Sequence, residues 1–165
     1  MSYFIDLSDY TYRGEFYRQR TLNVGWLSAG HDFEKKDSTE GILDLLWDYC
    51  SISIAQARGY YFCAFCAVQD FTIERRHGNA LMLGNAEIRV FSTAGEIYAA
   101  PNLIYHYIKM HRYAPPPGFL QALSQEPRPP REEYFLKLAK AGLDWCATTP
   151  YTSDTLILPK FGDKN

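Results

Sequence analysis

The sequence has no excess of basic residues, no long apolar run and no secretory leader. Its 165 residues include 17 Lys and Arg against 19 Asp and Glu, a net charge of −2. Without a basic excess the chain has no general attraction for phosphate backbones, which disfavours nucleic acid as a partner. No segment approaches the roughly 18 consecutive apolar residues of a membrane helix. The N-terminus lacks the basic segment and apolar run of a signal peptide. We therefore expect a cytoplasmic protein with no membrane partner.

Common catalytic motifs are also missing. The glycine-flanked segment at residues 78–85 lacks the Lys-Ser/Thr pair that a nucleotide-binding loop requires. The chain has no Gly-x-Ser-x-Gly elbow, the turn that carries the nucleophile of many hydrolases. The sequence therefore predicts no catalytic residues and no organic cofactor, and an enzyme is the less favoured class.

Cysteine is scarce, and only two of the four cysteines, Cys63 and Cys66, lie close together. In a reducing cytosol such a pair favours a metal site or redox chemistry over a disulfide. Cys50 and Cys146 are isolated, and we interpret them as packed thiols. Aromatic residues are abundant, with 13 Tyr, 10 Phe and 3 Trp. They indicate either a tyrosine-rich core or an exposed aromatic binding face.

Apolar periodicity predicts a small mixed α+β domain. Residues 38–50 form a helix whose apolar stripe is Ile42, Leu43, Leu45, Leu46 and Tyr49. Residues 86–91 and 96–99 alternate and are joined by a turn, which predicts a β-hairpin with Glu87 and Arg89 on a solvated face. The segment between Cys66 and residue 86 is expected to be a loop. A helix begins near Pro101 and ends before the prolines at 115–117.

The flanking segments are expected to be short elements. Residues 1–37 contain extended pieces, residues 119–123 a short helix and residues 126–130 a stiff linker. A helix follows at residues 132–145, and a last strand at residues 155–158. The inward residues of that helix are predicted to be Phe135, Leu138, Ala139 and Leu143. We expect one α+β domain at 1–125 with a central zinc site, and a C-terminal helix and tail at 126–165 that pack on it.

Two pairs of residues predict a structural Zn²⁺ site. Cys63 and Cys66 are separated by two residues, and His106 and His111 lie on one predicted helix, separated by four. Structural zinc is held tetrahedrally by thiolates and imidazoles, with ligand spacings of this kind. The predicted order of knuckle, hairpin and helix resembles a treble clef, in which the knuckle supplies two ligands and the helix the other two.

Several alternatives to this ligand set remain open. Residues five apart on an ideal helix are separated by roughly 140° around its axis. Either the final helical turn is tightened, or His77 replaces one of the two histidines. If Cys63 and Cys66 do not bind a metal, they are core thiols or a redox pair. A redox pair normally precedes a helix in a βαβ unit, which the sequence after Cys66 does not predict.

Five short motifs are typical of one protein family. They are LNVGWL at 22–27, GYYFCAFC at 59–66, GNAEIRV at 84–90, YAAP at 98–101, and LIYHY at 103–107 followed by HRYAPP at 111–116. Residues 59–123 resemble an uncharacterised bacterial protein family, a domain of unknown function. Its members carry a histidine two residues before the first cysteine, where this chain has Tyr61. The resemblance implies no known activity, substrate or partner.

Three functional hypotheses follow. The favoured one is a non-catalytic, zinc-stabilised protein-binding module of the bacterial cytosol. In one form it is an immunity-type protein that neutralises a toxin, because a mildly acidic chain suits a basic nuclease toxin. The first alternative is a metal-dependent nuclease or hydrolase that uses His77 and Glu87. The second is a nucleic-acid-binding module that uses Arg75, Arg76, Lys109 and Arg112 beside exposed tyrosines. The sequence predicts neither the partner's identity nor the oligomeric state.

Overall fold

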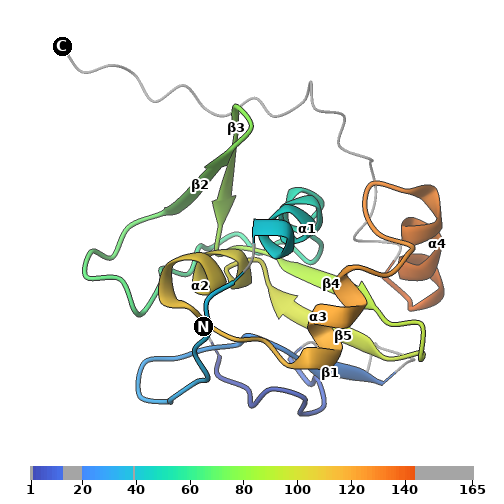
Figure 1. Cartoon of the computed structure of the whole chain (residues 1–165), viewed down its shortest axis with the longest axis horizontal. Coiled ribbons are helices and arrows are strands. Elements are labelled where there is room, and N and C mark those ends of the chain that lie inside the picture. The colour runs from blue at the N-terminus through green and yellow to red at the C-terminus, as the bar shows by residue number, and fades with distance from the viewer. Residues whose placement is uncertain (1, 13–19, 39, 144–165) are drawn as a thin grey trace.

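The computed structural model describes residues 2–12, 20–38 and 40–143, and this part contains two small sheets and four helices (Figure 1). The first sheet has the order β1-β5-β4, formed by Thr21–Asn23, Ile97–Pro101 and Glu87–Phe91. The second is a hairpin of β2, Thr72–Arg76, and β3, Asn79–Leu83. The helices are α1 (Glu40–Ser51), α2 (Ile104–His111), α3 (Pro117–Leu123) and α4 (Glu132–Lys140). The expected mixed α+β class is confirmed.

The predicted β4–β5 hairpin forms two of the three strands of the larger sheet, with β5 in the middle. Its antiparallel register pairs Glu87 with Pro101 and Phe91 with Ile97. β1 adds to the free side of β5 in parallel, and helices α1 and α3 pack on β4. Every residue of β4 and β5 is buried. The chain then passes directly from β5 into α2, so this hairpin determines where α2 begins.

The core is rich in tyrosine. Five tyrosines are almost completely buried: Tyr49, Tyr105, Tyr107, Tyr113 and Tyr134. α1 contributes the apolar stripe expected of it, with Leu43, Leu46 and Tyr49 inside. α4 buries Tyr134 and Leu138, whereas Ala139, which we had expected to face inward, is exposed. Residues four apart share one face of a helix, so Tyr134 and Leu138 together turn Ala139 outward.

Glu87 and Arg89 do not form a solvated strand face, and that prediction was wrong. Both side chains are buried, Arg89 completely, and Arg89 Nη1 lies 2.8 Å from Glu87 Oε2. The Tyr10 hydroxyl donates to the same oxygen at 2.7 Å. The Tyr134 hydroxyl donates to the Arg89 carbonyl at 2.8 Å. Alternating charged and apolar residues usually mark a surface strand, but two opposite charges on one face can be buried together if they pair.

Replacing Glu87 with Gln is expected to lower the free energy of unfolding by about 3–5 kcal/mol, because the Arg89 charge stays buried without its counter-charge. Urea denaturation of the two proteins measures the difference. Asp9→Asn is the matched control, since Asp9 pairs with Arg20 on the surface and such pairs contribute about 1 kcal/mol or less. Equal losses in the two variants would contradict this assignment.

The β2–β3 hairpin lies where a loop was expected. Its strands are joined by His77 and Gly78, which both have positive φ angles, 48° and 78°. Positive φ at both central residues is the mark of a type I′ turn, the tightest common hairpin connection. The expected strand at 155–158 and Cys146 lie outside the described residues. Within the described residues, no helix is both long and apolar enough to cross a membrane.

Candidate metal centre

Four side chains that are far apart in the sequence converge between the Cys63–Cys66 turn and α2. One atom from each of Cys63, Cys66, His106 and His111 lies within 4.8 Å of the corresponding atoms of the other three. Cys63 Sγ is 3.2 Å from His111 Nε2. Cys66 Sγ is 3.3 Å from His106 Nε2 and 3.5 Å from His111 Nε2. Sulfur and nitrogen donors of both pairs therefore face one point.

These distances fit a tetrahedral metal ion. With metal–sulfur bonds of about 2.3 Å and metal–nitrogen bonds of about 2.0–2.1 Å, a sulfur–nitrogen edge of the tetrahedron is about 3.6 Å long. The three sulfur–nitrogen distances, from 3.2 to 3.5 Å, are within a few tenths of an ångström of that edge. The four residues can therefore hold one metal ion as a two-sulfur, two-nitrogen set.

The cysteine turn is held from both sides. The Gln69 side-chain amide donates to the carbonyl of Cys63 at 2.9 Å and to that of Cys66 at 3.2 Å. Phe65, between the two cysteines, packs edge-on against Phe33 and Tyr107, with ring centroids 5.2 and 5.7 Å apart. This aromatic contact joins the turn to the core side of α2.

α2 presents both histidines without the tightened final turn, which was one of the two alternatives to an ideal helix. The helix ends at His111, and Arg112 adopts a left-handed conformation with φ of 59°. The amides of Arg112 and Tyr113 both donate to the Tyr107 carbonyl, bonds that span more residues than an α-helical bond. The two side chains are nevertheless long enough to converge, because each imidazole directs Nε2, the ring nitrogen farthest from the backbone, at a cysteine sulfur.

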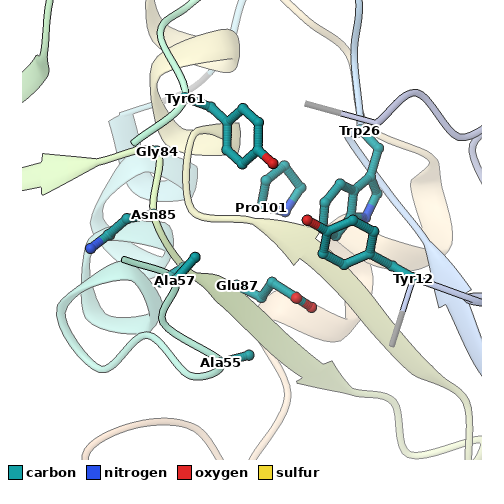
Figure 2. A pocket seen from close by; sticks show the side chains of 10 residues that line it. Tyr12, Trp26, Ala55, Ala57, Tyr61, Gly84, Asn85, Glu87 and Pro101 are labelled. Atoms are coloured by element: carbon teal, nitrogen blue, oxygen red, sulfur yellow. The ribbon is translucent and has the colours of Figure 1, made fainter. Parts of the chain in front are cut away.

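His77 does not belong to the cluster. It lies in the turn of the β2–β3 hairpin, its side chain is 74% exposed, and its Nε2 is 3.7 Å from Asp44 Oδ1. Tyr61 lines a different pocket of about 30 Å³ together with Tyr12, Trp26 and Glu87 (Figure 2). Among the described residues, one group of side chains could hold a metal ion, and it consists of the four predicted residues.

A family model described as a domain of unknown function, DUF7919, matches residues 2–124. The chain belongs to this family. No curated protein and no solved structure matches the chain. All four clustered side chains lie inside the matched DUF7919 region, whereas α4 follows it. The expectation of an uncharacterised family is thus confirmed, and any function has to be argued from the site itself.

In this DUF7919 domain the buried carboxylate of Glu74 contacts His106, one of the four clustered side chains. Glu74 Oε1 lies 2.9 Å from His106 Nδ1, and Lys109 donates to Glu74 Oε2 at 2.6 Å. Burial by itself raises the pKa of Glu74, but the hydrogen bonds from His106 and Lys109 outweigh it and lower the pKa. The carboxylate is thus charged and accepts the Nδ1 proton of His106. The unprotonated Nε2 is then free to act as the ligand atom.

Sequence reasoning missed Glu74 because it did not predict the hairpin that carries it. On β2 the even-numbered residues Thr72 and Glu74 face inward, and Ile73 faces out. The alternation in Thr72-Ile73-Glu74, followed closely by Gly78, was the available signal. Gln69 left no such signal, because its role depends on how the cysteine turn folds back on itself.

The protonation states of the remaining ligands suit metal binding that is coupled to proton release. Burial raises the pKa of the Cys63 thiol. Burial is the main cause of a lowered pKa of His111, and the nearby Lys35 acts in the same direction, so that the His111 imidazole is neutral at pH 7. A metal ion must therefore displace a proton from the Cys63 thiol but not from His111. Acidification returns protons to the ligands, so metal affinity falls as the pH falls.

Removing the carboxylate behind His106 is expected to weaken metal binding. For Glu74→Ala we expect an affinity for Zn²⁺ about 10–100-fold lower, the usual effect of losing a hydrogen-bond partner of a ligating histidine. Competition with a chromophoric chelator measures it. Glu74→Gln keeps an acceptor for His106, so its Zn²⁺ affinity is expected to lie between those of the wild type and Glu74→Ala. Glu133→Ala, at an exposed position of α4, is the control. An unchanged affinity in Glu74→Ala would remove the supporting role.

Proposed function

We propose that this DUF7919 domain is a non-catalytic protein-binding module whose fold is stabilised by structural Zn²⁺ held by Cys63, Cys66, His106 and His111. One observation carries the proposal, the closed set of two thiols and two imidazoles whose donor atoms lie within 4.8 Å of one another. Zinc is the metal that tetrahedral sulfur and nitrogen ligands favour. Four protein ligands leave no position for a substrate or a reactive water. The ion then stabilises the junction between the cysteine turn and α2.

The arrangement of the other candidate catalytic residues supports binding over catalysis. Glu87 is paired with Arg89 beneath Tyr10, and His77 is exposed in the turn of the β2–β3 hairpin. A nuclease or hydrolase centre requires a general base within hydrogen-bond reach of the metal-bound nucleophile. Neither residue belongs to the four-residue cluster, so they lend no support to a metal-dependent enzyme.

The charge pattern supports a protein partner over nucleic acid. Three of the four basic residues considered for phosphate contact are paired with carboxylates. The pairs are Arg76 with Glu40 and Asp44, Lys109 with Glu74, and Arg112 with Asp37. Pairing removes much of the positive field that phosphate binding requires. The net charge of −2 suits a basic partner, and the immunity-type version of the proposal takes that partner to be a toxin that the domain blocks in the bacterial cytosol.

Elemental analysis of the purified protein is expected to find one equivalent of zinc. Cys63→Ser and His111→Ala are expected to lose it, because each removes one of four ligands. At free zinc a thousandfold above Kd, the metal contributes about 4 kcal/mol to the free energy of unfolding. Chelation should therefore lower the stability of the wild type by a similar amount.

Two variants serve as matched controls for the zinc measurement. Cys50→Ala removes a buried thiol and His77→Ala an exposed imidazole, both outside the cluster. Both are expected to keep a full equivalent of zinc. Wild-type protein that binds no zinc, with added Zn²⁺ included, would overturn the metal site and leave Cys63 and Cys66 as core or redox thiols.

The binding role predicts a stoichiometric protein partner in the host. Zinc-loaded protein used as bait in nuclease-treated host lysate is expected to retain one basic protein in a defined ratio. In the immunity-type version, that protein has an activity that added DUF7919 domain suppresses. Recovery of no protein at stoichiometric level, together with turnover of DNA, RNA or ester substrates by the purified chain, would favour the enzyme alternative instead.

A further inference from the structure

The outer edge of β2 has no strand beside it. β2 pairs with β3 along residues 72–76, and among the described residues no other segment makes a backbone hydrogen bond to it. Figure 1 shows the β2–β3 hairpin standing away from the three-stranded sheet. β3 lies on the α1 side of the hairpin, and β2 reaches the helices through the side chains of Glu74 and Arg76. An open strand edge is a template for pairing with another chain.

The turn determines which backbone groups face outward. In a hairpin closed by two residues, the flanking pair, Arg76 and Asn79, exchanges both of its hydrogen bonds, and the exchange then alternates along the strands. Arg76, Glu74 and Thr72 thus direct their amides and carbonyls to β3. Ile73 and Arg75 direct theirs away from it. The free edge therefore offers two donors and two acceptors at the spacing of an antiparallel ladder.

The side chains along this edge form an exposed apolar patch. Phe71, Ile73 and Arg75 share one face of the strand, and Phe71 and Ile73 are 48% and 44% exposed. The rings of Tyr60 and Phe62, also exposed, stand edge-on to Phe71 with centroids 5.4 and 5.5 Å away. Charges usually protect an edge of this kind. Here the carboxylate of Glu74 faces inward to His106, and Arg75 is the only charged side chain among these three outward residues.

We infer that the β2 edge binds the β2 edge of a second copy of this chain, in antiparallel register about a two-fold axis through Ile73. In such a pairing the two Ile73 residues exchange both of their backbone hydrogen bonds, and each Arg75 amide donates to the Phe71 carbonyl of the other copy. The Phe71 amide does not take part, because it donates to the Asp70 carboxylate of its own chain at 2.6 Å. In this register Ile73 lies opposite Ile73 of the second copy, and Phe71 lies opposite Arg75. Two aliphatic side chains meet at the centre, and an arginine meets an aromatic ring at each end, a favourable cation–π pair.

A second copy fits the β2 edge because the edge is complementary to itself when two copies are related by a two-fold axis. Each contact occurs twice in an interface in which the same patch serves both partners. Two outward positive charges placed opposite each other would repel, whereas in this register each Arg75 lies opposite a Phe71 ring. The paired β2 strands would join two hairpins into one four-stranded sheet, with the aromatic patch on its exposed face. The edge is short, so the expected dimer is reversible. The inference does not rest on the metal proposal.

Sedimentation equilibrium of the zinc-loaded full chain over a wide concentration range tests this pairing. We expect a monomer–dimer equilibrium for the wild type. Ile73→Pro removes an outward N–H without taking a bond from β3, a position where an edge strand accepts proline. It is expected to weaken the dimer at least about tenfold, or 1.4 kcal/mol. Leu136→Ser, at an exposed apolar position of α4, is the control and should not change the equilibrium. Far-UV circular dichroism verifies that each variant is folded.

A charge exchange tests the register independently of any strain from proline. Arg75→Glu loses the contact with Phe71 of the second copy and is expected to weaken the dimer. Adding Phe71→Lys places a lysine opposite that glutamate and is expected to recover it. Within one chain these positions are four residues apart on a strand, too far to pair directly. A monomeric wild type at all concentrations, or a dimer unaffected by Ile73→Pro and Arg75→Glu, would overturn the inference. Failure of the double variant to recover would overturn the register.

Discussion

The contact between the Cys63–Cys66 turn and α2 is the constraint on which the functional part of this molecule depends. The turn has little secondary structure of its own, and it is held by Gln69, by the ring of Phe65 and by the two histidines. α2 is in turn held by the buried β5 strand that leads into it. Donors from two distant segments therefore meet because both are anchored to one core, and a metal ion would add a link at that meeting point.

Two buried carboxylates illustrate how this core accommodates charge. Glu87 is neutralised by Arg89 and bonded by Tyr10, which closes the sheet against the N-terminal segment. Glu74 is neutralised by Lys109 and bonded to His106, which orients an imidazole at the candidate metal centre. Burial of an ion is costly unless a partner and hydrogen bonds compensate it. The contact of Glu87 with Arg89 only compensates buried charge. The contacts of Glu74 also orient the His106 imidazole, and with it the candidate ligand atom.

Local patterns predicted a large part of the fold. The apolar stripe of α1, the β4–β5 hairpin and the helix that ends before the prolines all follow from periodicity within a few neighbouring residues. The β2–β3 hairpin was missed because β2 is a charged segment and β3 buries consecutive residues without a regular alternation. The burial of the Glu87–Arg89 pair was missed because Tyr10, whose ring lies against the Arg89 guanidinium and whose hydroxyl donates to Glu87, is 77 residues from Glu87 in the sequence.

The sequence by itself determined the chemical identity and spacing of the four donors, because a thiol pair three residues apart and an imidazole pair five residues apart are local properties. It did not determine that the four would meet, that His77 would lie elsewhere, or that Glu74 would stand behind His106. Those outcomes depend on contacts between segments about 30 to 50 residues apart. Only the packed core brings such segments together, so only the tertiary structure decided them.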